Sequence, residues 1–341
     1  MDFIQSIILG AVQGITEFLP ISSSAHLVII PYLFKWQYQG LIFDVALHFG
    51  TLLAIIIFFW RDWINIIANA IKPQISNLKP QTCISNLQNN NCHCEESATK
   101  QSGVRVIPHL MRDPDLSVDP RVKPEDDRKG GGDSPSEVPM LESESRHKIV
   151  GTNSYPKNLL WILLVATTPG AIAGILLEEQ AETIFRSPLI IAISLAVFGI
   201  IMWLIDKYSK NHCQLSAINF KLAIYIGLAQ MLAIIPGVSR SGSTMSAGRA
   251  IGLNRPDSAR FSFLLAAPIM LGSALFEARH LADITINASF YIGIITSLVF
   301  GLIAIKYLLQ YLQKGNYAIF TWYRVILAII VIAVFLMRQT N

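Results

Sequence analysis

The chain has 341 residues, of which 52% are hydrophobic and 15% are charged, and its formal net charge is +4. Soluble domains carry about 25% charged residues, so this composition excludes an ordinary soluble protein and indicates an integral membrane protein. The charge is small and scattered, and we expect no nucleic-acid partner.

The chain begins with an apolar region, Ile4–Leu33, that is interrupted midway by proline and serine residues. The interruption reads FLPISSSAH and runs from Phe18 to His26. A backbone broken in this way is tolerated at membrane depth only where protein or a water-filled cavity surrounds it. We therefore expect a re-entrant helical hairpin with a polar tip.

Six further segments are long enough to span a bilayer, which needs about 20 apolar residues. They are Leu41–Trp60, Leu159–Glu178, Ser187–Ile205, Phe261–Glu277, Phe290–Tyr311 and Ala318–Met337. Residues 73–156, in contrast, are polar and lack apolar periodicity, which predicts a disordered cytoplasmic insertion. The membrane domain is thus expected in two parts, 1–72 and 157–338.

A second interrupted region, Leu222–Leu253, predicts another re-entrant hairpin at about 218–255, with a break that reads IPGVSRSGST. Both interrupted regions contain Gly-x-x-Gln followed by proline and a serine-rich turn. The matching positions are Gly10, Gln13, Gly227 and Gln230. Matched interruptions in two halves indicate an inverted repeat with its site at the repeat interface. The expected fold is an all-α polytopic membrane protein with six transmembrane helices and two re-entrant hairpins in an inverted repeat.

Basic residues gather at the span ends that this layout places on one side of the membrane. They are Arg61, Lys72, Lys79, Lys207, Lys210, Arg249, Arg255, Arg260 and Lys314. By the positive-inside rule this side is cytoplasmic. Both chain ends are then expected to face outward.

The first interruption carries residues suited to acid–base chemistry. Gln13 and Glu17 lie four residues apart, on one face of a helix. Buried ionisable side chains are costly in a membrane, which favours a functional role for Glu17 and His26. The hydroxyl groups of Ser22–Ser24 are either nucleophiles or partners for the broken backbone. Asp44 and His48, in the next span, either support this site or are interfacial polar residues.

The second interruption places one arginine, Arg240, among serine and glycine residues. Glycine lets backbone N–H groups turn toward an anion, and a helix that starts there adds its positive end. The planar guanidinium is suited to phosphate. Together the two interruptions offer the nucleophile, proton acceptor and charge neutralisation that phosphoryl transfer requires.

The two motifs read GAVQGITEFLPISSSAH, from Gly10, and PGVSRSG, from Pro236. They resemble the signature motifs of the undecaprenyl-diphosphatase (bacitracin-resistance) family, over roughly 1–72 and 157–338. The resemblance implies a multi-pass protein of the bacterial inner membrane, with two oppositely entering hairpins and a site open to the outer face. It implies hydrolysis of undecaprenyl diphosphate to undecaprenyl phosphate and phosphate, which recycles the lipid carrier for peptidoglycan synthesis and confers bacitracin resistance.

Carried over position by position, the resemblance implies a set of site residues. The implied catalytic residues are Glu17, Ser23, His26 and Arg240. The implied substrate-binding residues are Gln13, Ser239, Ser241, Gly242 and Thr244. The resemblance leaves open whether Ser23, His26 or a water molecule is the nucleophile. Our hypothesis is that Glu17 activates Ser23 or orients metal-bound water, and that His26 protonates the leaving lipid phosphate. Glu17 is also the implied ligand of a divalent cation, Mg²⁺ or Ca²⁺.

The implied partners are a polyprenyl diphosphate substrate and membrane lipids, and both a monomer and a homodimer stay open. The main alternative function is a polyprenyl-phosphate lipid transporter or flippase, because inverted repeats with broken helices are typical of secondary transporters. The insertion departs from the family, in which a short loop is usual. It resembles a translated repetitive element, and we expect no function for it.

Overall fold

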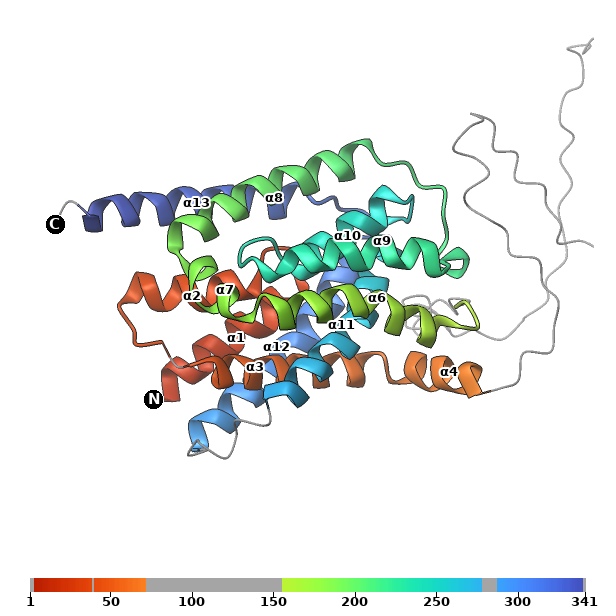
Figure 1. Cartoon of the computed structure of the whole chain (residues 1–341), viewed down its shortest axis with the longest axis horizontal. Coiled ribbons are helices and arrows are strands. Elements are labelled where there is room, and N and C mark those ends of the chain that lie inside the picture. Colours follow the sequence, from red (N-terminus) through yellow and green to blue (C-terminus); the bar gives the residue numbers. More distant parts are fainter. Residues whose placement is uncertain (1–2, 39, 72–154, 278–286, 340–341) are drawn as a thin grey trace, which may run out of the picture. The chain divides into compact units, whose positions relative to one another are not determined.

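A computed structural model describes residues 3–38, 40–71, 155–277 and 287–339. The predicted insertion lies outside these residues except for its last two positions. The described part of the chain is helical, with one isolated β-bridge between Cys213 and Leu253. This confirms the all-α class (Figure 1).

Six of the described helices are long and apolar enough to cross a membrane. They are α3 (Leu41–Phe58), α6 (Leu159–Leu176), α8 (Pro188–Tyr208), α11 (Arg255–Glu277), α12 (Ala288–Tyr311) and α13 (Ala318–Gln339). Each of the six predicted spans overlaps one of them. The largest difference is at α11, which begins at Arg255 rather than Phe261 because the preceding polar turn is already helical.

The shorter elements fall mainly in the two interrupted regions. They are α1 (Phe3–Phe18), α2 (Ser23–Phe34), α4 (Trp60–Ile71), α7 (Glu178–Glu182), α9 (Phe220–Met231) and α10 (Arg240–Ala250), with 3-10 turns η2 (Ile184–Arg186), η3 (Leu215–Ala217) and η4 (Leu232–Ile234). The first interruption separates α1 from α2, and the second separates α9 from α10. Each region is thus a pair of short helices joined by a turn.

The two turns use the same backbone device. Ser22 precedes α2 and Ser239 precedes α10, and both have φ of 74°, a value that non-glycine residues rarely adopt. Each serine caps the following helix, because its hydroxyl oxygen accepts a hydrogen bond from a backbone N–H three residues later. Ser22 follows Gly10, and Ser239 follows Gly227, by the same interval of 12 residues. Strained residues of this kind gather at functional sites.

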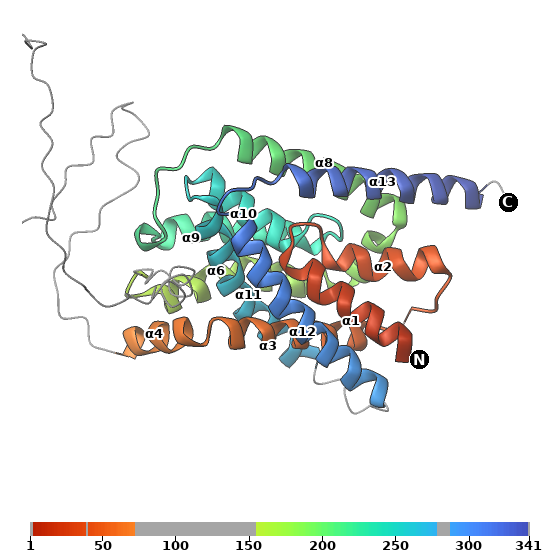
Figure 2. The ribbon, with the colours of Figure 1, turned by 180° about the vertical axis from the view of Figure 1, so that it is seen from behind.

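Small residues allow the short helices to pack closely against long ones. A side chain at Gly10 would overlap the carbonyl oxygen of Gly293 in α12, and a side chain at Gly227 would overlap that of Ala166 in α6. Such close backbone approach is typical of helix pairs in membranes. Consequently α1 lies on α12 and α9 lies on α6, while α8 and α13 run side by side (Figures 1 and 2).

A buried ionic cluster links the last turns of α8 and α10 to the starts of α11 and α13. The carboxylate of Asp206, in α8, is 4% exposed and accepts hydrogen bonds from Arg249 at 3.1 Å, from Arg255 at 2.8 Å and from the backbone N–H of Tyr317 at 3.1 Å. These partners lie on α10, at the start of α11 and just before α13. One side chain therefore joins four helices.

Replacing Asp206 with alanine should lower the free energy of unfolding by about 3–5 kcal/mol, because it leaves the buried charge of Arg249 without its carboxylate partner. Thermal unfolding in detergent measures the change. Asp62→Ala is the matched control, since it removes an ion pair to Arg260 alone, at 3.1 Å. Equal losses in both variants would contradict the account of the cluster.

Candidate active site

The two turns meet each other directly. The backbone N–H of Gly237 donates to the hydroxyl oxygen of Ser22 over 3.1 Å, and the hydroxyl of Ser241 donates to the Leu19 carbonyl oxygen, also over 3.1 Å. Segments more than 200 positions apart in sequence thus share one polar interior. The Ser22 hydroxyl accepts hydrogen bonds from backbone N–H groups, which agrees with the predicted alternative that it is a partner for the broken backbone.

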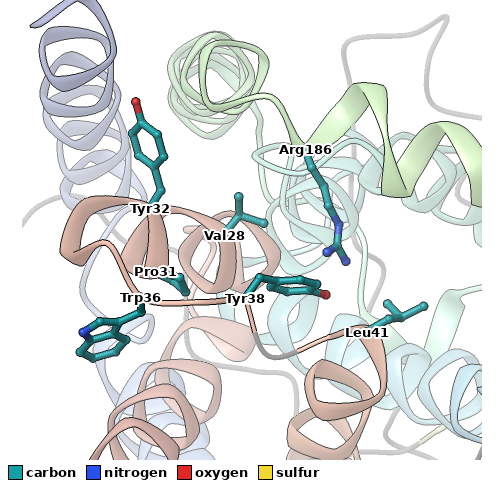
Figure 3. A pocket seen from close by; sticks show the side chains of 7 residues that line it. All are labelled: Val28, Pro31, Tyr32, Trp36, Tyr38, Leu41 and Arg186. Atoms are coloured by element: carbon teal, nitrogen blue, oxygen red, sulfur yellow. The ribbon is translucent and has the colours of Figure 1, made fainter. Parts of the chain in front are cut away.

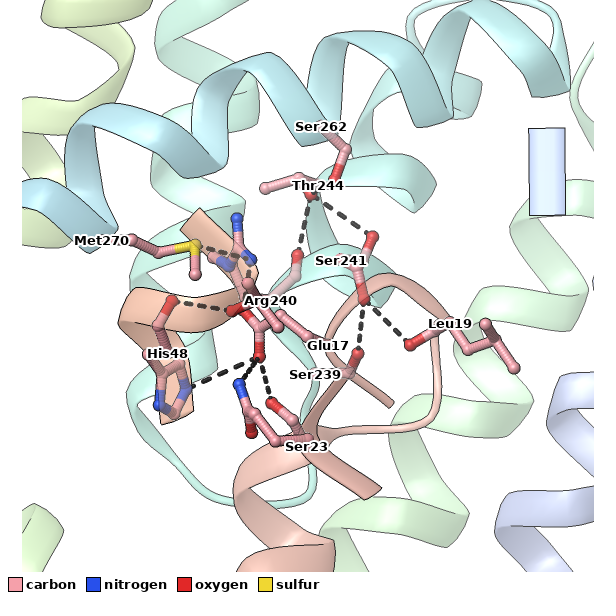
Figure 4. A network of polar contacts seen from close by, with 12 residues as sticks. Glu17, Leu19, Ser23, His48, Ser239, Arg240, Ser241, Thr244, Ser262 and Met270 are labelled. Carbon is pink, nitrogen blue, oxygen red and sulfur yellow. Dashed lines mark hydrogen bonds and ion pairs between the residues drawn. The ribbon is translucent and has the colours of Figure 1, made fainter. Parts of the chain in front are cut away.

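Glu17 is the centre of this interior (Figure 4). Its side chain is 4% exposed, and its Oε2 atom accepts hydrogen bonds from Gln13 Nε2 at 2.9 Å and from Ser23 Oγ at 2.5 Å. Its Oε1 atom forms an ion pair with the guanidinium of Arg240 from the second turn. The structure therefore brings together four predicted site residues, Gln13, Glu17, Ser23 and Arg240.

His48 also belongs to this site. Its Nε2 atom lies 3.5 Å from Glu17 Oε2, and its Nδ1 atom lies 2.7 Å from the carbonyl oxygen of Asp44. Its side chain is 31% exposed, far more than that of Glu17. Of the two alternatives for His48, the structure thus supports contact with the site.

The remaining residues of the second turn hold its backbone in place. Ser239 caps α10 by accepting from the N–H of Gly242 at 3.1 Å, and Thr244 Oγ1 donates to the carbonyl of Arg240 at 2.8 Å. Thr244 Oγ1 also lies 2.6 Å from the hydroxyl of Ser262. These contacts fix where the chain presents the Arg240 side chain. They do not bring the Ser239 or Thr244 hydroxyl into contact with Glu17.

His26 lies apart from the contacts of Glu17. Its ring is buried, with Nδ1 2.6 Å from the Ser22 carbonyl oxygen and Nε2 2.7 Å from the hydroxyl of Tyr323. It also stacks on the Tyr323 ring, with 5.7 Å between centroids. Both nitrogens are therefore engaged by the first turn and by α13, a contact that sequence spacing does not predict.

The oxygen atoms around Glu17 suit a hard divalent cation shared with a substrate. The described residues contain no group of three or more His, Cys, Asp or Glu side chains placed to hold a metal. Gln13 Oε1, however, is buried without a hydrogen-bond partner, and the Nε2 atom of the same amide donates to Glu17 Oε2. Mg²⁺ is usually bound by one or two carboxylates together with substrate phosphates, so this donor set fits.

A cavity of about 500 Å³ lies between α2, the start of α3 and η2 (Figure 3). Its lining is Val28, Pro31, Tyr32, Trp36, Tyr38, Leu41 and Arg186. The Arg186 guanidinium lies 4.6 Å from the Tyr38 ring centroid and 3.8 Å from the Asp44 carboxylate, which also accepts from the Tyr38 hydroxyl at 2.8 Å. Burial and the neighbouring Asp44 charge raise the pKa of Tyr38, which keeps its hydroxyl a donor. Since Asp44 contacts His48, the cavity wall is linked to Glu17.

Six membrane-length helices and two facing turns define a multi-pass membrane protein with a buried carboxylate–guanidinium site. The family described as "Bacitracin resistance protein BacA" matches residues 6–89 and 138–330, and the chain belongs to this family. The residues between these matches, 90–137, fall within the polar stretch 73–156. Both turns and the site residues described above lie inside the two matched segments.

Curated relatives match along nearly the whole chain. A protein of Moorella thermoacetica named undecaprenyl-diphosphatase is 39% identical over 99% of this chain and 100% of its own length. Proteins of the same name from Pelotomaculum thermopropionicum and Methanosphaera stadtmanae are 38% and 34% identical, over 99% and 97% of this chain and 99% and 98% of their own lengths.

Proposed function

We propose that this chain hydrolyses undecaprenyl diphosphate to undecaprenyl phosphate and inorganic phosphate, and so recycles the lipid carrier for peptidoglycan synthesis. The observation that carries the proposal is the meeting of Glu17 and Ser23 with Arg240 from a second turn, 223 positions away. This arrangement has the proton acceptor, the nucleophile and the charge neutralisation that phosphoryl transfer needs. Relatives that match over their full length are named for this activity.

Substrate binding would change the partner of Arg240. In the present state its guanidinium is paired with Glu17. A diphosphate offers the same planar recognition with more negative charge, so Arg240 would turn to the terminal phosphate. Glu17 would then be free to accept a proton.

Glu17 would take that proton from Ser23 or from a water molecule. The Ser23 hydroxyl already donates to Glu17 Oε2. The activated oxygen attacks the terminal phosphorus in line with the bridging oxygen, whose bond to that phosphorus breaks and releases undecaprenyl phosphate. With Ser23 as nucleophile, water then releases phosphate from the serine. His26 would protonate the leaving lipid phosphate, for which one ring nitrogen would exchange its present partner, the Ser22 carbonyl oxygen or the Tyr323 hydroxyl, for the lipid phosphate.

The proposal includes a divalent cation, Mg²⁺ or Ca²⁺, held by Glu17 and by the unpaired Oε1 of Gln13. When bound, the cation neutralises charge on the two phosphates. Gln13 would also keep the Glu17 carboxylate oriented through its Nε2 atom. The backbone around Ser239, Ser241, Gly242 and Thr244 would frame the phosphate while Arg240 provides the charge.

We further propose that the two helix pairs are re-entrant hairpins of an inverted repeat. The helix contacts support a two-fold relation: α1 packs on α12 as α9 packs on α6, and α3 packs on α12 as α11 packs on α6. The pairs α3–α11 and α8–α13 would each map onto themselves. The basic ends of the spans would be cytoplasmic, which leaves the site open to the outer face of the inner membrane.

Phosphate release from undecaprenyl diphosphate by the purified protein tests the function. We expect release that a chelator abolishes and that added Mg²⁺ or Ca²⁺ restores. A folded protein that releases no phosphate in either condition, but moves labelled lipid across liposomes, would contradict the proposal and favour a transporter.

The cavity offers a route for the lipid. Its aromatic and aliphatic walls suit isoprene units, and Arg186 faces into it (Figure 3). Arg186→Ala should raise KM by about tenfold with kcat within about twofold, since it removes binding that the ground and transition states share. Arg61→Ala is the matched control, because Arg61 also lies over an aromatic ring, that of Trp60 at 5.1 Å, but neither residue lines the cavity. Equal kinetics of both variants would exclude this route.

A further inference from the structure

Arg324, in α13, is a fully buried arginine that the proposed chemistry does not use. Its side chain is 0% exposed, and all of its hydrogen-bond partners among the described residues are backbone carbonyls. Burial of a charge is costly unless hydrogen bonds compensate it. Such a side chain in a membrane helix indicates a specific role.

The partners of Arg324 come from both turns and from α8. Its Nη1 atom donates to the Pro20 carbonyl of the first turn at 3.4 Å. Its Nη2 atom donates to Gly237 at 2.5 Å and to Val238 at 3.1 Å, both in the second turn, and its Nε atom donates to Leu195 of α8 at 3.1 Å. One rigid guanidinium therefore bridges the two turns through their backbone carbonyls.

The bridged carbonyls are close in sequence to the reacting groups. Pro20 lies midway between Glu17 and Ser23, and Val238 lies two residues before Arg240. A Cβ atom added at Gly242 would lie 3.3 Å from Arg324 Nη1, so the guanidinium also packs against the start of α10. A shift of either turn would thus move Glu17 and Ser23 relative to Arg240.

We propose that Arg324 is a positioning residue that sets the register of the two turns, that is, their position relative to each other. This inference rests on the proposed phosphatase function. The three nitrogens of its planar guanidinium donate to carbonyls of α8 and of both turns, whereas lysine has all of its donors on a single nitrogen. Charge alone would not maintain the register. Lysine at this position should therefore fail to replace arginine.

Arg324→Lys should lower kcat/KM by about 100-fold, the size of effect that a small misplacement of catalytic groups produces. Thr321→Val is the matched control: Thr321 is buried on the same helix, one turn away, and donates to Gly199 of α8 at 2.9 Å without reaching either turn. We expect Thr321→Val to stay within about twofold of the wild type. A kcat/KM of Arg324→Lys within about threefold of wild type would overturn the proposal.

A double-mutant cycle with Ser22→Ala separates positioning from general stability. Ser22 joins the turns directly through Gly237, so its loss and that of Arg324 act on the same register. The effect of the double variant on kcat/KM should differ from the product of the single effects by at least about fivefold, since coupled residues are not additive. Thr321→Val combined with Ser22→Ala should give the product of its single effects within about twofold. Independent effects of Arg324→Lys and Ser22→Ala would overturn the proposal.

Hydrogen exchange gives a readout that does not depend on activity. In folded Arg324→Lys protein, peptides that cover residues 19–24 and 236–241 should both exchange faster than in wild type, and in Thr321→Val they should not. Should Arg324→Lys not fold, Arg324→Gln is compared in the same way. Unchanged exchange at both turns would overturn the positioning role, whereas a wild-type protein without phosphate release would overturn the proposed function and leave this result standing.

Discussion

Replacing Arg240 with lysine is expected to lower kcat/KM for diphosphate hydrolysis by about 10²–10³. Removal of one preorganised donor to developing charge typically has this effect on rate, and lysine is a point charge without the planar fork that phosphate recognition uses. Arg240 is also the group that neutralises Glu17 between turnovers, through their ion pair. The loss should therefore appear in both kcat and KM.

Phosphate release at saturating and limiting substrate separates the two parameters for Arg240→Lys. The matched control is Arg249→Lys, because Arg249 is buried in the same helix but binds Asp206 at 3.1 Å, away from the turns. This control should lower stability and leave kcat of the folded protein unchanged. Full activity of Arg240→Lys would remove Arg240 from the site.

Replacing Glu17 with glutamine is expected to lower kcat by about 10³, within the range associated with a general base. Glutamine preserves the size of the side chain and one acceptor oxygen, but its NH2 group cannot accept the hydrogen bonds made at the other oxygen, and it cannot take the proton of Ser23. In the proposed mechanism Arg240 holds the terminal phosphate and is unchanged in this variant, so KM should change less than kcat.

Single-turnover phosphate release measures the chemical step of Glu17→Gln directly. Thr16→Val is its control, since Thr16 is a buried neighbour whose hydroxyl donates to the Val12 carbonyl at 2.7 Å. A kcat for Glu17→Gln within about tenfold of the wild type would exclude Glu17 as the proton acceptor.

The helices and both interruptions could be predicted from the sequence because the bilayer constrains them locally. Apolar length determines the spans, and proline, glycine and serine mark the breaks. The α4 helix, Trp60–Ile71, escaped this reasoning. It has an amphipathic pattern and buries Ile66 alone, so neither an apolar span nor a polar loop describes it.

The site was predicted only as far as its residue types allow. The motifs name Glu17, Ser23 and Arg240, but their mutual contacts depend on how the two turns meet in space. The role of His26 at the reacting phosphate stays a prediction, and its contact with Tyr323, 297 positions away, is a tertiary feature without a local signal. Arg324 did have such a signal, as an ionisable residue in an otherwise apolar span.

The claim that the two turns form one phosphatase site is tested most directly by phosphate release from undecaprenyl diphosphate with wild type, Glu17→Ala, Arg240→Ala and the double variant. We predict metal-dependent release by the wild type and a severe loss in each folded single variant. The double variant should lose little more than the worse single variant, because residues that act as a unit are strongly non-additive. Losses that multiply in the double variant, or a folded wild type that releases no phosphate, would contradict a single site built from both turns.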